Sequence, residues 1–343
     1  MTVSKTVTVT VPATTANLGP GFDCIGAALS LYNQFKFTCV DAVGSFRVSI
    51  AVTGAEAQLV KTDESNLLYQ AFVRFYEFLG QVPPPVQIEI LLGVPLARGL
   101  GSSATAIVGG LVGANYLAGT PLDERQVMEL AIALEGHPDN VVPALLGGCR
   151  LAAMGFSNEP QRRQSRGGVP LLEGTGVRGG RRGEEEGEGF GGWQVCDVCW
   201  HSDVVPVVAI PNFELETQEA RKVLPIEVSR ADAIFNAAHL GLLLRGLETG
   251  RGDWLRAAMQ DRLHQPYRQA LIPGYEAVRQ AAMAAGALGM VISGAGPTLL
   301  ALVNAAQAAD VEMAMGMAWQ EEGVMAQVRS LSIEPQGAMN LTA

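Results

Sequence analysis

The chain has 343 residues, of which 48% are hydrophobic and 17% are charged, and its formal net charge is −10 at pH 7. This length and composition supply enough apolar side chains for two compact domains and exclude a chain that is disordered throughout. The acidic excess argues against a nucleic-acid partner, because binding to a phosphate backbone needs a basic surface. Five cysteines at irregular spacing, and an N-terminus without a basic and apolar leader, predict a cytoplasmic protein.

Two segments, residues 99–119 and 281–303, carry no charged side chain and are about as long as a membrane-spanning helix of ~20 residues. Both are interrupted by glycine, and the second contains the sequence SGAGPT at its centre, which would break a helix inside a bilayer. We therefore predict no membrane partner. A membrane protein is the remaining alternative, and solubility without detergent would dismiss it.

In chain order, alternating or β-branched residues first predict strands over residues 3–11, 35–40, 46–53 and 86–92. Apolar residues at helical spacing predict a helix over residues 66–79, which the prolines at 83–85 end. Further helices are expected over residues 104–117 and 122–134. Strands followed by helices favour an α+β fold over a doubly wound sheet.

Residues 157–194 have a different composition, with 11 glycines, six arginines, six glutamates and almost no large aliphatic residues. This composition predicts a disordered surface insertion, because it offers too little apolar surface to order the chain. Beyond it, strands are expected over residues 204–211, 289–292 and 298–303. Helices are expected over residues 217–223, 229–247, 253–260, 275–285 and 311–322. We read this half as a second α/β-sandwich domain.

The segment from Val94 to Ala106, VPLARGLGSSATA, predicts a phosphate site. Gly99 and Gly101 can adopt positive φ and let a ligand approach the backbone closely. The Ser-Ser-Ala run that follows opens a helix, whose first N–H groups and partial positive charge favour an anion. The segment is neither a P-loop, since no lysine follows the glycines, nor a dinucleotide fingerprint, since the third glycine is missing.

Three other segments are rich in polar residues and glycine, namely PATTANLGPGFD at 12–23, EGHPDN at 135–140 and SGAGPT at 293–298. With the segment from Val94 to Ala106 they make four. In their order along the chain, these four segments resemble the GHMP small-molecule kinases, and so do TQEARKVLP at 217–225 and DRLHQPYR at 261–268. Within that superfamily they are most similar to the branch that acts on homoserine. The resemblance covers nearly the whole chain except residues 157–194, where that branch has a much shorter turn.

The resemblance implies an N-terminal α/β domain like ribosomal protein S5 over residues 1–200, and a C-terminal ferredoxin-like α/β sandwich over residues 201–343. It implies transfer of the γ-phosphate of ATP to the hydroxyl of L-homoserine, giving O-phospho-L-homoserine and ADP in threonine biosynthesis. One alternative is a GHMP kinase for another small alcohol such as mevalonate or shikimate. Another is a sensor that binds ATP and a metabolite without catalysis. A homodimer is compatible with the sequence, which does not fix the oligomeric state.

The implied cofactors are ATP and Mg²⁺. Ser103 and Glu129 resemble the family's magnesium ligands, and Glu135 competes with Glu129 for that role. Asn66 resembles the position that contacts adenine, although an asparagine there could equally cap a helix. The remaining positions that resemble the nucleotide site are Pro95, Arg98, Gly99, Leu100, Gly101, Ser102, Ser103 and Ala104.

Arg221 and Arg268 resemble the family's two arginines for the substrate carboxylate. The groups that would hold its amino group and hydroxyl are Asn17, Asp23, His137 and Asp139. Gly294 and Gly296 are expected to pack against this site from the second domain.

Mevalonate-kinase-like relatives have an aspartate where this chain has Asn140, and an amide does not accept a hydroxyl proton in the usual way. We therefore expect Asn140, Ser103 and Asp139 to act by positioning and charge stabilisation. If a general base exists, it would be Asp139 or Asp23.

Overall fold

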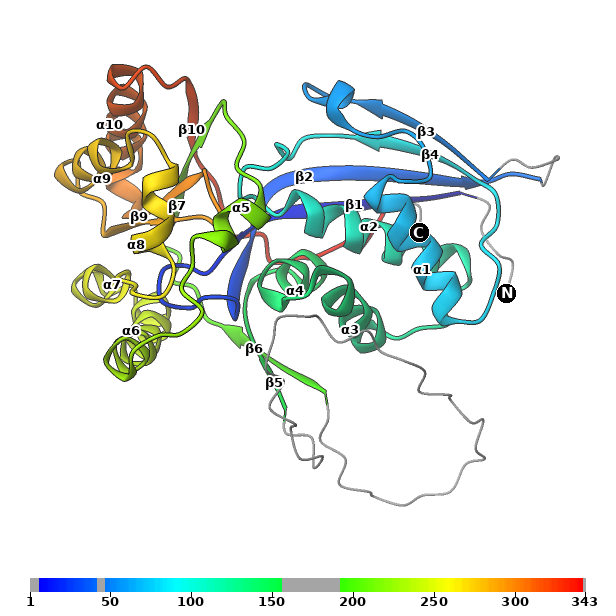
Figure 1. Ribbon diagram of the computed structural model, residues 1–343, viewed down its shortest axis with the longest axis horizontal. Helices are drawn as coiled ribbons and strands as arrows, with labels where there is room; N and C mark the ends of the chain where they lie inside the picture. The colour runs from blue at the N-terminus through cyan, green and yellow to red at the C-terminus, as the bar shows by residue number, and fades with distance from the viewer. Residues whose placement is uncertain (1–5, 42–46, 156–191, 342–343) are drawn as a thin grey trace.

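The computed structural model describes residues 6–41, 47–155 and 192–341. Within them, seven strands form a first sheet in the order β11-β1-β2-β4-β3, with β5 pairing with β2 and β6 with β5 (Figure 1). These strands are β1 (Thr6–Ala16), β2 (Ile25–Cys39), β3 (Val48–Thr53), β4 (Val86–Leu91), β5 (Cys149–Met154), β6 (Trp193–Val198) and β11 (Met339–Asn340). The pairing is antiparallel except between β3 and β4.

The alternation seen in the first residues of the chain sets which face of the first sheet is covered. Val7, Val9 and Val11 on β1 are fully buried, and Val9 lies opposite Phe35 on β2. Strand β2 begins ten residues before the predicted strand at 35–40, because pairing with β1 and β5 fixes the Gly- and Ala-containing stretch 25–34. Sheet pairing here outweighs low local strand propensity.

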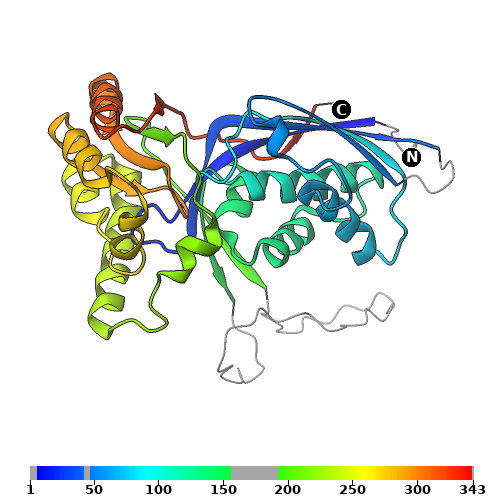
Figure 2. The ribbon, with the colours of Figure 1, turned by 45° about the horizontal axis from the view of Figure 1, so that its top comes forward.

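Four helices cover one face of the first sheet (Figure 2). They are α1 (Leu67–Phe78), α2 (Ser102–Leu117), α3 (Glu124–Glu135) and α4 (Pro138–Leu146), with a short 3₁₀ turn, η1 (Ala57–Leu59), before α1. Three of them match the predicted helices, whereas α4 was not predicted. Pro138 stands at its first turn, where a proline is tolerated because the first N–H groups of a helix have no partner within it.

The second sheet has the order β10-β7-β9-β8 in the described part of the chain. Its strands are β7 (Val204–Pro211), β8 (Gly289–Ile292), β9 (Leu299–Asn304) and β10 (Ala326–Ser330). Its helices are α5 (Thr217–Lys222), α6 (Arg230–Thr249), α7 (Gly252–Ala258), α8 (Gln265–Arg268), α9 (Tyr275–Ala284) and α10 (Ala308–Glu321), with 3₁₀ turns η2 (Gln269–Leu271) and η3 (Ala305–Gln307).

Both faces of the second sheet are buried. Val207 and Ala209 on β7 share a core with residues of α9 and α10. Val208 and Ile210 point to the other face, into a core that includes residues of α6 and α7 and also Leu18 and Ile25 of the N-terminal half. The two sheets are thus joined through this shared apolar core.

The predicted boundary near residue 200 falls between β6 and β7, which belong to different sheets. The end of the chain does not stay with the second sheet, however. Ile333 forms a bridge to Leu29, and β11 pairs with β1. The C-terminal segment therefore packs on the N-terminal half, and the division of the chain into domains at residue 200 stays a prediction.

Residues 156–191, which contain most of the insertion expected at 157–194, lie outside the described residues. Its last two residues, Trp193 and Gln194, begin β6 and pair with Met154 and Ala153. These two residues, which were expected to be disordered, therefore belong to a strand. No helix in the described ranges is long and apolar enough to cross a membrane.

A close contact between α1 and α2 depends on Gly110. A Cβ atom added there would lie 2.3 Å from the Leu68 carbonyl oxygen and 2.9 Å from the Ala71 Cβ. We expect Gly110→Ala to lower the free energy of unfolding by about 1–3 kcal/mol, because the two helices must move apart.

Gly241→Ala is the matched control, since Gly241 lies inside α6 and an added Cβ meets no atom within 4 Å. It should raise the free energy of unfolding by up to about 1 kcal/mol, because alanine favours the helix. Urea unfolding of both variants measures the difference. Equal effects would contradict the close packing at Gly110.

Candidate active site

A small polar cavity, about 60 Å³ in volume, lies where the loops of the N-terminal half meet the second sheet. Most of the predicted site residues line it. They are Asn17, Asp23, Gly99, Gly101, Ser102, Ser103, His137, Asp139, Asn140, Arg221, Arg268 and Gly294. Residues from six separate stretches of sequence thus meet at one place.

The glycine turn before α2 has the geometry that the sequence predicts. Gly99 and Gly101 have φ of 73° and 69°, and Gly101 is the N-cap of α2. A Cβ atom at Gly101 would lie 2.0 Å from the Thr14 Oγ1, which donates a hydrogen bond to the Asn140 Oδ1 at 2.7 Å. The first N–H groups of α2 have no acceptor within the helix and are suited to bind an anion at the cavity.

The second glycine-rich turn, between β8 and β9, closes the cavity from the other sheet. The Ser293 hydroxyl donates to the Gly99 carbonyl at 2.6 Å and contacts the Thr15 Oγ1 at 2.9 Å. Gly294 lines the cavity, and its N–H donates to the Ala16 carbonyl. An added Cβ at Gly99 would lie 2.8 Å from the Gly296 carbonyl oxygen, so Gly296 also packs on the loop.

Glu135, and not Glu129, is the carboxylate beside Ser103. The Ser103 Oγ donates to the Glu135 Oε1 at 2.7 Å. Burial raises the pKa of Glu135, and the hydrogen bond from Ser103 opposes that shift. Both oxygens lie at the cavity, next to the start of α2.

The side chain of Glu129 points away from the cavity. It does not lie beside Ser103, as the prediction of two ligands for one magnesium ion requires. Its side chain is 41% exposed and pairs with Arg125 at 3.1 Å on the surface of α3. Six residues along an α-helix correspond to a rotation of about 600°, so Glu129 and Glu135 leave the helix about 120° apart. Because α3 ends at Glu135, that residue is the one brought to the cavity.

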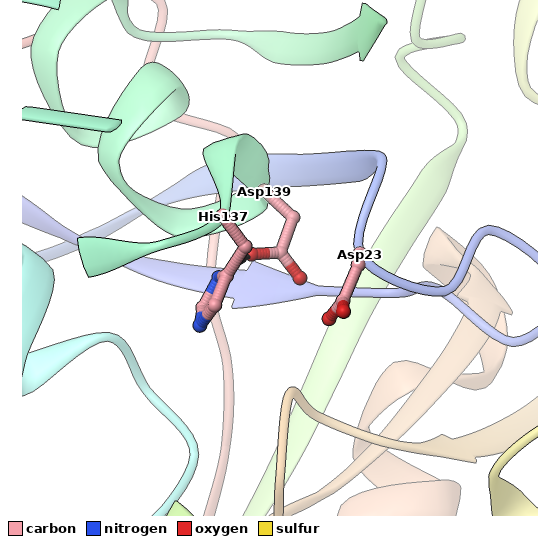
Figure 3. A group of neighbouring side chains, drawn as sticks. All are labelled: Asp23, His137 and Asp139. Carbon is pink, nitrogen blue, oxygen red and sulfur yellow. Dashed lines mark hydrogen bonds and ion pairs between the residues drawn. The ribbon is translucent and has the colours of Figure 1, made fainter. Parts of the chain in front are cut away.

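The acidic wall of the cavity consists of Asp23, His137 and Asp139, whose side-chain ligand atoms lie within 4.8 Å of one another (Figure 3). His137 and Asp139 lie at the start of α4, whereas Asp23 belongs to the loop between β1 and β2. The His137 Nδ1 is 2.5 Å from the Asp139 Oδ1. Burial works against the charged imidazole, but the hydrogen bond and charge of Asp139 raise the pKa of His137 overall.

The basic wall consists of Arg221, on α5, and Arg268, at the end of α8. Arg221 forms a bidentate pair with Asp23, at 3.0 and 2.8 Å. Arg268 is only 2% exposed, and it donates to the carbonyls of Ala220 and Gly294 at 3.1 and 3.0 Å. Burial, followed by the charge of Arg221, lowers the pKa of Arg268 to about 10. Opposite charges thus line two sides of one cavity.

Asn66 caps the start of α1, which is one of the two roles that the sequence allows. Its side chain accepts hydrogen bonds from the N–H groups of Leu68 and Tyr69 and donates to the Lys61 carbonyl. Asn66 nevertheless lines a second cavity, about 360 Å³ in volume, together with Leu67, Ser102 and Ser103. This cavity therefore adjoins the start of α2.

Besides Asn66, four residues of the predicted nucleotide site do not line the polar cavity. Pro95 and Arg98 line a different cavity, and Arg98 pairs with Glu56 at 2.6 Å and donates to the Pro211 carbonyl. Leu100 and Ala104 are fully buried. These four side chains are therefore not in the wall of the polar cavity, and their place in the nucleotide site stays a prediction.

Thr217 also lines the cavity, although the sequence did not lead us to predict it as a site residue. It is the first residue of α5, four positions before Arg221, so the two share one face of the helix. That spacing, applied to the predicted arginine, would have found it.

The comparisons with known proteins agree on one family. Residues 66–148 match the model of the GHMP kinases N terminal domain, and residues 243–318 match that of the GHMP kinases C terminal. The homoserine kinase of Microchaete diplosiphon is 65% identical over 341 residues, 99% of each chain. That of Nostoc punctiforme is 65% identical over 338 residues, 98% of this chain and 99% of its own.

Comparison with solved structures points to the same family. The homoserine kinase from Cytophaga hutchinsonii has a TM-score of 0.79 and 26% identity over 99% of both chains. The mevalonate kinase of L. major, with 15% identity and a TM-score of 0.62 over 96% of both chains, shares the fold alone. The two sheets, the glycine turns and these full-length likenesses together show that the chain belongs to the homoserine kinase family of the GHMP kinases.

Proposed function

We propose that the polar cavity binds L-homoserine and that the chain transfers the γ-phosphate of ATP to its hydroxyl, giving O-phospho-L-homoserine for threonine synthesis. The observation that carries this proposal is the pair of facing charged walls. A carboxylate suits the guanidinium groups of Arg221 and Arg268, and an ammonium group suits the carboxylate of Asp23. Asn17, His137 and Asp139 then remain for the amino group and the hydroxyl.

The phosphates of ATP would lie on the N–H groups at the start of α2, beside Gly99, Gly101, Ser102 and Ser103. The adjoining cavity of about 360 Å³, which has Asn66 and Leu67 in its wall, has room for the base. Asn66 would contribute to this cavity mainly by fixing the start of α1, because its amide is already hydrogen-bonded to the backbone.

The oxygens of Ser103 and Glu135 fit Mg²⁺, which prefers hard oxygen ligands and usually keeps waters and substrate phosphates as its others. Bound there, the ion would neutralise charge on the phosphate groups. Glu135 replaces Glu129 in this proposal.

The ion pair between Asp23 and Arg221 occupies the place that the substrate would take. L-homoserine carries both charges of that pair, so its ammonium can replace Arg221 beside Asp23 while its carboxylate replaces Asp23 beside Arg221. Each of these half-buried charges then keeps a partner, and the exchange avoids the cost of leaving one unpaired.

The contacts of Asn140 and Asp139 support catalysis by positioning. Asn140 accepts from Thr14 and donates to the Asp139 Oδ1 at 3.3 Å, so its amide orients Asp139 and takes no proton. Asp139, with His137 beside it, would orient the acceptor hydroxyl towards the phosphate. Asp139 and Asp23 stay the candidates if a general base is required.

We also propose the cytoplasm as the compartment, because all five cysteines are free thiols, as is usual in a reducing environment. The homodimer stays a prediction, which sedimentation of the purified chain measures.

The direct test of the proposed function is ADP release by the purified chain with ATP and Mg²⁺. We expect turnover with L-homoserine, and little with D-homoserine, L-serine, mevalonate, shikimate or no acceptor, because only L-homoserine places both charges and its hydroxyl correctly. Selective turnover of another alcohol would contradict the substrate assignment. ATP binding without turnover of any acceptor would indicate a sensor.

The metal site is tested by Glu135→Gln, with Glu129→Gln as the matched control on the same helix. We expect Glu135→Gln to raise the Mg²⁺ concentration at half-maximal rate by at least about 10-fold, because a ligand oxygen loses its charge. Glu129→Gln should change it by less than about twofold, since only a surface ion pair is lost. Titration of the rate with Mg²⁺ measures both. The reverse order would restore Glu129 as the ligand.

A further inference from the structure

His264 is a fully buried histidine that joins two parts of the active site. It lies just before α8 with a side-chain exposure of 0%. Its Nε2 is 2.9 Å from the Gly19 carbonyl oxygen, and its Nδ1 is 3.4 Å from the Nη1 of Arg268. A carbonyl only accepts and a guanidinium only donates, so Nε2 carries the proton and Nδ1 accepts. The imidazole is therefore a neutral bridge.

Asp261 holds the backbone of the segment that carries His264. Its side chain is also 0% exposed. The Asp261 carboxylate accepts hydrogen bonds from the backbone N–H groups of Leu263, His264 and Gln265, at 2.7–2.9 Å. It also accepts from the Asn236 side chain at 2.7 Å. The backbone under the imidazole is thus held in one conformation, which makes the bridge rigid.

The aromatic ring of Phe22, in the loop that carries Asp23, also contacts His264 and the two arginines. Phe22 stacks on His264 with ring centroids 5.2 Å apart, and the guanidinium carbon atoms of Arg268 and Arg221 lie 5.2 and 5.7 Å from its centroid. Cations over an aromatic ring are attracted to its face, so the ring supports two arginines that repel each other. Phe22 adjoins Asp23, and Gly19 belongs to the same loop.

The bridge determines which atom of Arg268 is presented to a ligand. Within the described residues, the hydrogen bonds of Arg268 use Nε, to Ala220, and Nη1, to Gly294 and His264. Nη2 is left to reach a carboxylate in the cavity. Loss of the imidazole would remove one of the three contacts that orient the guanidinium, and one of the contacts that hold the loop carrying Asp23.

We propose that His264 is a positioning residue for substrate recognition, which holds the Arg268 guanidinium at a fixed distance from the Asn17–Asp23 loop so that both charges of an α-amino acid are bound at once. This inference rests on the proposed function of the cavity. His264 touches Arg268 and the loop, so it acts through Arg268. Burial lowers the pKa of His264, in keeping with a neutral imidazole.

The test compares His264→Leu, which removes both hydrogen bonds, with His264→Gln, whose planar amide keeps a donor and an acceptor. We expect His264→Leu to lower kcat/KM for L-homoserine by roughly 10- to 100-fold, mainly through KM, with KM for ATP changed by less than about twofold. His264→Gln should recover most of this loss. If His264→Leu does not fold, His264→Asn takes its place, because its shorter amide cannot reach the Gly19 carbonyl.

Two further measurements separate positioning from a general loss of stability. Val278→Ala, in the buried core under α9, should lower the melting temperature and leave KM for L-homoserine unchanged. In a double-mutant cycle, His264→Leu and Arg268→Lys should be strongly non-additive in kcat/KM, because each disables the same contact. Additive effects, or equal increases in KM for ATP and for L-homoserine, would overturn the inference. Failure of the unmodified chain to use L-homoserine would instead overturn the proposed function.

Discussion

The contact between the Gly99–Gly101 loop and the Ser293–Gly296 turn is the constraint on which the rest of the site depends. Any side chain at Gly99 would collide with the Ser293 carbonyl, since a Cβ atom would lie 2.2 Å from that oxygen. The Ser293 hydroxyl then ties the loop to β1 through Thr15. Because the two segments belong to different sheets, this contact fixes the anion-binding start of α2 relative to Arg221 and Arg268. In the proposed site, this contact would place the phosphate donor and the acceptor together, as phosphoryl transfer chiefly requires.

The chain carries a net charge of −10, yet it must bind two anionic groups at one site. The local positive groups that we propose for this binding are the N-terminus of α2 and two arginines, both of which lie over the ring of Phe22. Placing Arg268 in the interior is unfavourable for its charge, as the fall of its pKa to about 10 shows. Its hydrogen bonds to two carbonyls, and the pairing of Arg221 with Asp23, offset that cost.

The sequence predicted those parts of the site that depend on local chemistry. The glycine turn before α2 was found because Gly-X-Gly-Ser-Ser has a backbone requirement that is visible in the residues themselves. The magnesium ligand was expected at Glu129, and the ligand that we propose is Glu135, because sequence spacing does not show that α3 ends at Glu135 and turns that side chain to the cavity. Likewise α4 and the first half of β2 were missed, since tertiary pairing, and not propensity, determines them. His264 is recognisable only once the fold brings Gly19 and Arg268 to either side of it.

We propose that a zwitterionic amino acid replaces the ion pair between Asp23 and Arg221 in the cavity. A crystal structure of the chain with L-homoserine bound tests it most directly. The account predicts that the bidentate contact between Asp23 and Arg221 opens, with the ligand carboxylate on Arg221 and Arg268 and its ammonium group beside Asp23. A ligand bound elsewhere, with the contacts of 2.8 and 3.0 Å between Asp23 and Arg221 unchanged, would contradict it.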